Sequence, residues 1–466
     1  MSSQSPSHFR DQISTLTDDG QRRKWLYPKV IKGKLYQYRS VVSYFFLTLL
    51  FAAPFIKLNG EQLVLLNVLE RKFVFFGVIF WPQDFYLFVL ALLTFMVFIV
   101  LFTVVFGRVF CGWACPQTIF LEMVFRKIEI WIEGDANKRK KLDDGPLTSE
   151  KFFKKGWKHF LYLLISFFIA NIFLSYLISS DSLIKIITEP VSQHWSGFIS
   201  ICVFTFVFYL VFSRMRELVC TVVCPYGRLQ GVLLDNQSII VAYDYERGEP
   251  REKRVKGVEN AGGDCIDCKL CVQVCPTGID IRNGTQMECV NCTACIDACD
   301  MVMEKIDRPI RLIGFKSEDE IKTKQPFKLN KRVYGYAAVL ALLIGVLSYL
   351  LITRTAVKTT ILRASGTLYQ MRDKEKAVSN LFNAELINKT SKSLKFKIVP
   401  DDPEVKIQYI QKQDTIAYGG VAKLTFFVIM PQRKLKTYKS DIGFKLVSDG
   451  KVVDTFETTF IAPLND

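Results

Sequence analysis

The sequence predicts a polytopic α-helical membrane protein with five spans, a cysteine-rich insert before the last span and a C-terminal β-sandwich. Three observations support this fold class. Half of the 466 residues are hydrophobic, and five long segments carry no charge. Eight of the 13 cysteines stand in one short window with a repeated spacing. The last hundred or so residues alternate apolar and polar side chains, as half-buried strands do.

The five charge-free segments run over residues 40–56, 85–106, 160–180, 196–213 and 333–353. Each is close to the ~20 residues that a helix needs to cross the hydrocarbon core of a bilayer. A mostly polar tail precedes the first segment, so we do not expect a cleaved signal peptide. The chain is therefore expected to cross a membrane five times.

Basic residues predict the orientation of these spans. The tail 1–39 and the loop after the second segment are rich in Lys and Arg, whereas the loops 57–84 and 181–195 contain few. The positive-inside rule then places the tail, that loop and the loop 214–332 in the cytoplasm, and the region after the fifth span outside. The net charge of +16 thus indicates topology and contact with anionic lipid rather than nucleic acid.

The cysteine window contains Cys-x2-Cys-x2-Cys-x3-Cys twice, which is the bacterial ferredoxin spacing. In that arrangement the fourth cysteine of each copy ligates the cluster of the other copy. Zinc sites and disulfides are the alternatives, but zinc sites use cysteine pairs and disulfides disfavour cysteines this close together. We assign one [4Fe–4S] cluster to Cys265, Cys268, Cys271 and Cys299, and the other to Cys289, Cys292, Cys295 and Cys275.

This dicluster ferredoxin-like insert covers about residues 262–304 of the loop 214–332. Polar linkers flank it, so we expect a unit tethered to the membrane at both ends. Between the two copies, Asn283-Gly284 predicts a short hairpin.

The region after the fifth span, residues 354–466, reads as a separate domain. Short alternating runs such as 394–398, together with the turn signal Asp449-Gly450, predict an immunoglobulin-like β-sandwich. No cysteine follows Cys299, which suits a domain on the oxidising side of the membrane.

Four further cysteines form a second repeat. The motif Cys-x3-Cys-Pro follows the second and the fourth charge-free segments, with cysteines at 111 and 115 and at 220 and 224. If each helix continues, both thiols of a pair lie on one face, and the proline then ends or bends the helix. Two facing pairs would make a four-thiolate site, and soft thiolates select Cu(I), zinc or iron–sulfur clusters. Chance packing of cysteines in helix ends is the alternative, and Cys202, alone in mid-span, is expected to be a buried packing residue.

Other redox cofactors lack their usual signals. The three histidines, His8, His159 and His194, all lie outside the middle of the spans, so paired axial ligands for a membrane haem are not expected. No glycine-rich dinucleotide loop follows a strand pattern. Electrons are therefore expected to come from another protein or from a quinol.

The motifs resemble those of the CcoG/FixG/RdxA family, accessory proteins for assembly of cbb3-type cytochrome c oxidase. The resemblance rests on the segments 80–84, 107–118, 220–228 and 289–303 and covers nearly the whole chain. It implies a multi-pass protein of the bacterial inner membrane, with a cytoplasmic ferredoxin-like insert and a periplasmic immunoglobulin-like domain. It also implies reduction of Cu(II) to Cu(I), with Cys111, Cys115, Cys220 and Cys224 as copper ligands or part of the reduction site. Asp300, where a second ferredoxin repeat often has proline, is a departure that leaves all eight ligands intact.

Three functional classes follow from these observations. The first is a cupric reductase, because low-potential clusters make copper reduction downhill and thiolates favour the Cu(I) product. Its implied partners are copper ions, copper-transporting or copper-chaperone proteins, oxidase assembly factors, membrane lipid and an electron donor that the sequence does not identify. The second is a quinol-linked electron-transfer subunit of the NapH/NosR type that passes electrons to a partner enzyme without binding copper. The third is an assembly scaffold, and at the four membrane cysteines copper, a third cluster or no resident metal all stay open.

Overall fold

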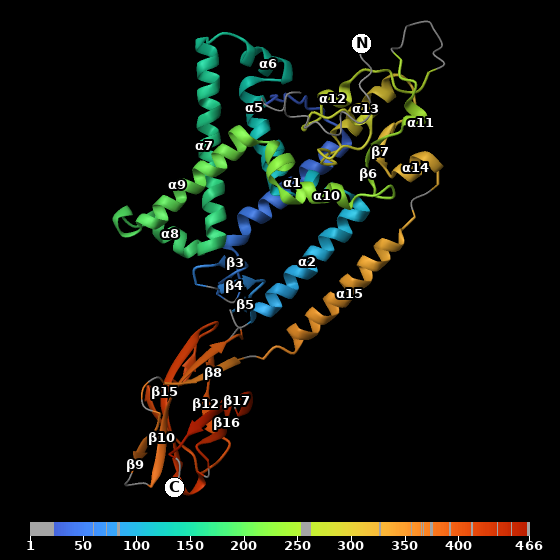
Figure 1. The fold of residues 1–466 in the computed structure, drawn as a ribbon. Helices are drawn as coiled ribbons and strands as arrows, with labels where there is room; N and C mark the ends of the chain where they lie inside the picture. The colour runs from blue at the N-terminus through green and yellow to red at the C-terminus, as the bar shows by residue number, and fades with distance from the viewer. Residues whose placement is uncertain are drawn as a thin grey trace. The chain divides into compact units, whose positions relative to one another are not determined.

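The structure, a computed structural model, describes residues 23–463 except 59, 71, 82–83, 253–261, 326–327, 356, 365, 367, 373–375, 391–392, 412, 436 and 449. Three predicted features lie wholly or partly outside these residues: the tail before Arg23, the linker 253–261 and the turn residue Asp449. The chain forms two compact units (Figure 1). Unit one comprises Met1–Phe55 and Val89–Gly345, and unit two comprises Ile56–Phe88 and Val346–Asp466.

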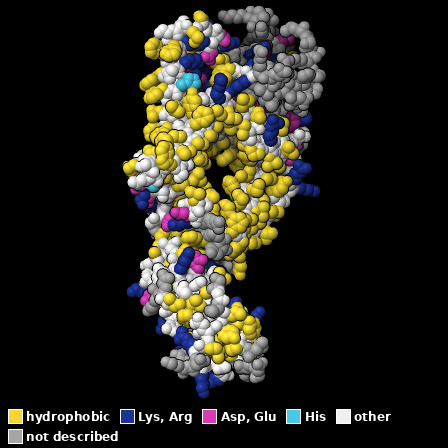
Figure 2. Space-filling view, turned by 60° about the vertical axis from the view of Figure 1, so that its left-hand side comes forward, with side chains coloured by type: hydrophobic (Ala, Val, Ile, Leu, Met, Phe, Trp, Pro, Cys, Tyr) yellow, Lys and Arg dark blue, Asp and Glu magenta, His cyan; other side chains and the backbone are white. Residues whose placement is uncertain are grey.

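Five helices of the described chain are long and apolar enough to cross a membrane, which confirms the predicted number of spans. Large apolar side chains are exposed along them, and Figure 2 shows hydrophobic side chains gathered over the helical part. The third of them begins well before its charge-free segment, because Thr148 caps it and Glu150 pairs with Lys154 in its polar first turns. The five are α1 (Lys34–Ala52, continued by Ala53–Phe55), α2 (Phe85–Phe106), α7 (Ser149–Ile178), α9 (Trp195–Leu210, continued by the π-helix η5, Val211–Met215) and α15 (Lys331–Ile352).

Shorter helices connect the spans of unit one. Three of these segments are π-helical, and π-turns inside helices occur frequently at functional sites. The sequence pattern did not predict them. After α2 come α3 (Val109–Trp113), α4 (Pro116–Ile119), the π-helix η3 (Phe120–Phe125), α5 (Arg126–Glu133) and α6 (Ala136–Asp144); α8 (Ser180–Thr188) precedes α9, and η6 (Val219–Val223, π-helical) and α10 (Pro225–Leu233) follow η5.

The ferredoxin-like insert is built on short helices and one antiparallel strand pair. Strand β6 (Ile240–Tyr243) pairs with β7 (Ile313–Lys316), and α12 (Leu270–Gln273) and α13 (Ala294–Lys305) follow the two cysteine loops. The predicted hairpin at Asn283-Gly284 is wrong, because the segment is a 3-10 helix, η7 (Ile281–Asn283). Its cause is local: the Asp280 carboxylate accepts the backbone N–H of Arg282 and binds its guanidinium. The insert is completed by α11 (Tyr245–Gly248) and α14 (Glu318–Thr323).

The insert packs on the start of α1 as well as being joined to the spans at its ends. Asp297 of α13 accepts the backbone N–H groups of Leu35 and Tyr36 at 3.2 and 2.8 Å, so it caps α1. Lys29 N–H donates to the carbonyl of Gln273 at 2.9 Å. Figure 1 shows α13 beside the beginning of α1. The described part of the predicted basic tail therefore binds the insert to the first span.

The C-terminal part of unit two is a β-sandwich, as predicted. One sheet has the order β13-β15-β10-β8 with β9 on β10, and the other has the order β12-β16-β17. Phe382 of β10 lies opposite Phe426 of β15, and both are fully buried with Phe444 and Phe460 in the core. The strands are β8 (Val357–Arg363), β9 (Gln370–Arg372), β10 (Ala377–Asn388), β12 (Lys397–Pro400), β13 (Lys406–Gln411), β15 (Val421–Pro431), β16 (Lys439–Ser448) and β17 (Lys451–Ile461), with a small pair β11 (Leu394–Lys395) and β14 (Thr415–Ile416).

The loop between α1 and α2 belongs to the same unit. It forms a three-stranded meander of β3 (Val64–Asn67), β4 (Lys72–Phe75) and β5 (Val78–Phe80), preceded by the pair β1 (Lys57–Leu58) and β2 (Glu61–Gln62). Asp84, which is 2 % exposed, pairs with Arg354 and Lys389 at 2.5 Å each. Asp84, directly before the second span, therefore ties this loop to the C-terminal part of unit two.

Candidate metal and electron-transfer sites

The two Cys-x3-Cys-Pro motifs each restart a helix at the second cysteine. Cys115 is the N-cap of α4 and Cys224 is the N-cap of α10, and the following proline is the first helical residue in both. Proline fits that position because its fixed φ suits the helix and its missing N–H is not needed there. The continuous helix assumed for stacking two thiols on one face is therefore absent, and each pair spans a helix junction instead.

The structure brings the four thiols of these motifs together. Cys111 interacts electrostatically with Cys115 and Cys224, and Cys220 with Cys111 and Cys115. Cys115 also interacts electrostatically with Cys224. Within the described residues, no three His, Cys, Asp or Glu side chains lie close enough to hold a single metal ion. The case for a metal here therefore rests on the four soft donors and not on a closed coordination cage.

Burial keeps the thiols of Cys111, Cys115 and Cys220 protonated until a metal binds. It raises the pKa of Cys111 to about 11, against the opposing charge of Arg108. It raises the pKa of Cys220 to about 12. Burial also raises the pKa of Cys115, although the backbone N–H groups of Thr118 and Gln117 at the start of α4 oppose the shift. A thiophilic metal or cluster would displace these protons, because the thiolate is the ligand form.

The eight ferredoxin-type cysteines surround two separate cavities. One is lined by Cys265, Cys268, Cys271 and Cys299. The other is lined by Cys275, Cys289, Cys292 and Cys295, and Cys271 also reaches it. These groups match the two crossed ligand sets predicted from the spacing. We call the centres cluster one (Cys265 set) and cluster two (Cys289 set), and the donors fit two [4Fe–4S] groups.

The two cysteine loops share the same backbone conformation as well as the same cysteine spacing. Asp267 and Asn291, at equivalent positions, have φ values of 50° and 51°, and Lys269 and Thr293 have values of 55° and 65°. Lys and β-branched Thr rarely adopt this left-handed conformation, and such residues concentrate at functional sites. Each loop turns twice in the same way, which directs its first three cysteines into one cavity.

The cluster-two loop packs directly on the first Cys-x3-Cys-Pro motif. Trp113 Nε1 donates to the backbone oxygen of Asn291 at 3.2 Å. A Cβ placed on Gly112 would lie 3.0 Å from the backbone carbonyl of Asn291 and closer still to the carbonyl oxygen of Val290. Arg39 of α1 donates through Nε to the carbonyl of Gly112 at 2.8 Å. The peptide between two cluster-two ligands is thus in contact with the peptide beside Cys111.

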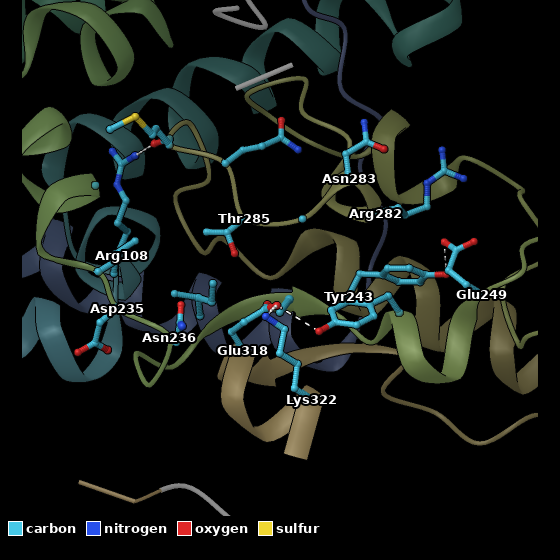
Figure 3. A pocket seen from close by; sticks show the side chains of 18 of the residues that line it. Arg108, Asp235, Asn236, Tyr243, Glu249, Arg282, Asn283, Thr285, Glu318 and Lys322 are labelled. Atoms are coloured by element: carbon cyan, nitrogen blue, oxygen red, sulfur yellow. Dashed lines mark hydrogen bonds and ion pairs between the residues drawn. The ribbon is translucent and has the colours of Figure 1, made fainter. Parts of the chain in front are cut away.

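Sequence reasoning missed two polar residues at this junction, Arg108 and Gln230. The Oε1 atom of Gln230 accepts from Arg108 Nε at 2.8 Å and from the thiol of Cys111 at 3.3 Å. Arg108 also donates to the backbone oxygen of Met287, as the dashed line in Figure 3 shows. An arginine does precede both motifs, but Arg216 binds the carboxylate of Glu129 at 2.8 Å instead. An arginine before each motif therefore did not by itself identify Arg108 as part of the site.

The remaining cysteine and the described histidines lie outside these sites. Cys202 is exposed on α9, so the prediction of a buried packing residue is wrong; its side of the span faces away from the protein. His159 Nδ1 bonds the hydroxyl of Tyr209 at 3.0 Å, and His194 pairs with Glu189. His8 lies outside the described residues.

Three protein-family models match the chain. A 4Fe-4S dicluster domain matches residues 215–318, and a 4Fe-4S binding domain matches residues 88–139 and 193–236. An "IG-like fold at C-terminal of FixG" matches residues 347–463.

Similar proteins carry the names FixG, RdxA and RdxB. Nitrogen fixation protein FixG of Rhizobium meliloti is 37% identical over 308 residues, which are 63% of this chain and 57% of that protein. Protein RdxA of Cereibacter sphaeroides is 34% identical over 353 residues, 73% of each chain. RdxB of the same organism is 37% identical over 301 residues, 63% of each. The match thus spans less than two thirds of FixG and of RdxB.

Among solved structures, a FixG-related protein from Vibrio parahaemolyticus is 20% identical and aligns over all of its length and 24% of this chain, with a TM-score of 0.21. That score is too low to bear on the fold. The sequence matches, together with two iron–sulfur domains and five membrane helices, place the chain in the FixG/CcoG/RdxA family of membrane iron–sulfur electron-transfer proteins.

Proposed function

We propose that the protein reduces Cu(II) to Cu(I) for assembly of the copper centre of a cbb3-type cytochrome c oxidase. The observation that supports this function best is the contact between the cluster-two loop and the first Cys-x3-Cys-Pro motif. Trp113 bonds the backbone of Asn291, and Gly112 lies against Val290 and Asn291. An electron leaving cluster two therefore has a short, packed route to the four thiols.

The chemistry balances as a one-electron transfer to a substrate metal. Bound [4Fe–4S] clusters supply electrons one at a time at low potential. For each Cu(II) reduced, one electron leaves the protein's clusters, and the donor that refills them is a reduced protein or a quinol. The thiols of Cys111, Cys115, Cys220 and Cys224 lose protons as they bind the metal and stabilise Cu(I) over Cu(II).

We also infer the sides of the membrane from charge. The segment α6, before the third span, contains Lys138, Arg139, Lys140 and Lys141, whereas α8 on the other side of that span contains one basic residue, Lys185. The positive-inside rule supports a cytoplasmic insert and a periplasmic β-sandwich in the bacterial inner membrane. In this arrangement, copper-transporting or chaperone proteins deliver copper from the cytoplasmic side, and oxidase assembly factors receive it.

A second candidate is an electron-transfer subunit that passes electrons to a partner enzyme and carries a third cluster on the four membrane cysteines. It is favoured by the match to the 4Fe-4S binding domain, whose two segments contain Cys111, Cys115, Cys220 and Cys224 and none of the eight ferredoxin-type cysteines. Both candidates share the same electron route and differ in what the four thiols hold.

Metal analysis of the full chain purified without oxygen separates the two candidates. Two clusters give about eight irons per chain and three give about twelve. Copper reduction is measured by mixing pre-reduced protein with Cu(II) and following Cu(I) with a chelator.

The variant Cys111→Ser/Cys115→Ser should lose copper reduction and keep the iron of clusters one and two. Serine preserves the shape of the site but removes the soft thiolate that stabilises Cu(I). Cys202→Ser is the matched control, since this exposed cysteine lies outside both motifs. A double variant that binds and reduces copper as well as the parent would eliminate the copper site, and the electron-transfer subunit would take its place.

A further inference from the structure

Arg108 is a buried cation held at the junction between the two kinds of cysteine site. Its side chain is 3 % exposed. Nε donates to Gln230 of α10. A terminal nitrogen donates to the backbone oxygen of Met287, two residues before Cys289, as Figure 3 shows. The other terminal nitrogen would lie 3.1 Å from a Cβ on Gly227, so a glycine makes room for it. The guanidinium is thus fixed by α10 on one side and by the cluster-two loop on the other.

Thiols and one carboxylate, that of Glu288, which forms no ion pair with it, lie within electrostatic reach of Arg108. Cys111 and Cys220 of the four-thiol site, and Cys289 of cluster two, all interact electrostatically with its guanidinium. Among the described residues no carboxylate forms an ion pair with it, whereas the buried Arg126, Arg139 and Arg216 pair with Glu122 or Glu129. A buried charge without a partner is costly. Thiolates that bind a metal on either side would supply this negative charge.

We propose that Arg108 is a counterion shared by cluster two and the four-thiol site, and that its charge raises the reduction potential of both centres. Reduction adds negative charge to each centre, and a fixed cation stabilises the reduced state more than the oxidised state. Arginine is suited to this task because it stays protonated at every accessible pH. The inference rests on the cluster part of the proposed function and does not need the four thiols to hold copper.

Cluster one provides an internal reference. Its neighbouring cation is Arg282, which interacts with Cys271 and is neutralised by ion pairs to Asp267 and Asp280 at 2.5 and 2.6 Å. Loss of the Arg108 charge should therefore shift cluster two and leave cluster one nearly unchanged.

The test is a redox titration of the full chain without copper, followed by electron paramagnetic resonance. Arg108→Gln should lower the reduction equilibrium constant of cluster two on the order of tenfold, which is about 59 mV for one electron. Arg433→Gln removes the same charge from a largely exposed ion pair of the β-sandwich and should shift neither cluster. An Arg108→Gln protein with parental iron content and an unchanged cluster-two potential overturns the proposal.

A second variant keeps the test decisive if the glutamine variant fails to assemble. Gln230→Glu places a carboxylate where the Gln230 amide oxygen accepts from Arg108 Nε, so it neutralises the cation without removing it. The cluster-two potential should then fall as in Arg108→Gln, and an unchanged potential at parental iron content refutes the counterion role. If Arg108→Gln shifts the cluster-two potential as expected but the parent protein does not reduce copper, this inference holds and the proposed copper reduction is refuted.

Discussion

Replacing Gly112 by alanine tests whether the contact between the cluster-two loop and the first Cys-x3-Cys-Pro motif carries electrons. Gly112 has no left-handed φ, so only space excludes a side chain there. The new Cβ would meet the backbone of Val290 and Asn291, which cannot rotate away as a side chain would. We expect the two loops to separate.

The distances from the added Cβ to the neighbouring backbone atoms determine how much Gly112→Ala should destabilise the contact. Contact with the Asn291 carbonyl at 3.0 Å is tighter than ordinary van der Waals packing, and the contact with the Val290 oxygen is tighter still. The loop must therefore retreat by several tenths of an ångström or more. Inserting one methyl group into a close-packed site of this kind costs about 1–3 kcal/mol of stability.

The assay compares electron delivery with cluster assembly. Pre-reduced Gly112→Ala protein should contain parental iron, oxidise its clusters more slowly on addition of Cu(II), and unfold at a lower temperature. Gly156→Ala is the matched control, because Gly156 lies in α7 with no atom within 4 Å of the added Cβ. Alanine there should be neutral or stabilise the helix by up to about 1 kcal/mol.

Parental oxidation kinetics together with a parental unfolding temperature in Gly112→Ala would refute the reasoning. Slower kinetics at unchanged stability would still support the electron route. Lower stability with unchanged kinetics would show that the contact is structural only.

Three further predictions follow from the ligand sets, the charge pattern and the buried ion pairs. Cys275→Ser should remove the signal of cluster two, whose other ligands are Cys289, Cys292 and Cys295, and retain that of cluster one; selective loss of cluster one would refute the crossed assignment. Reporter fusions after residues 150 and 310 should read cytoplasmic and a fusion after residue 400 periplasmic; a cytoplasmic reading at all three would mean that α15 does not cross the membrane. Asp84→Ala should destabilise unit two by about 3–5 kcal/mol, because it leaves Arg354 and Lys389 buried without a counterion. Glu404→Ala, at the exposed pair with Arg433, should cost less than about 1 kcal/mol in the same thermal unfolding measurement.

The sequence was most informative where physical constraints act over short distances along the chain. Long charge-free segments predict spans because a bilayer of fixed thickness demands them. The ferredoxin spacing predicted which cysteines share a cavity, because short gaps leave a loop few ways to present its thiols. Alternation predicted strands of the C-terminal sandwich, such as β12 and β16, because one face of each is buried.

Long-range contacts explain what the sequence did not predict. Gly112 and Asn291 are far apart in the chain, and nothing in either motif shows that they meet. The role of Asp297 as a cap for α1 depends on docking of the insert, which spacing does not specify. The hairpin prediction at Asn283-Gly284 was wrong because a neighbouring aspartate offered the backbone a closer partner than a second strand.

The two Cys-x3-Cys-Pro motifs are alike in sequence, but their surroundings divide the work between them. Burial alone would raise the pKa of Glu129, yet Arg216 binds both its oxygens, at 3.0 and 2.8 Å, and holds the pKa well below its usual range. Arg139 adds a third contact to that carboxylate at 3.0 Å, so the second motif is anchored to the scaffold of α5 and α6.

Arg108, before the first motif, forms no ion pair with a carboxylate among the described residues. It donates instead to Gln230, which also accepts from the Cys111 thiol, and to the backbone of the cluster-two loop. Arg216 thus fixes the position of the second thiol pair, whereas the positive charge of Arg108 stabilises an electron that arrives at cluster two or at the four thiols. Because of this division, exchanging the residues that surround Arg108 and Arg216 should abolish electron delivery to the four thiols, even though the two motifs have the same sequence pattern. A glutamate placed near Arg108 would neutralise its charge and lower the potential of cluster two, as Arg108→Gln does, without removing a single cysteine.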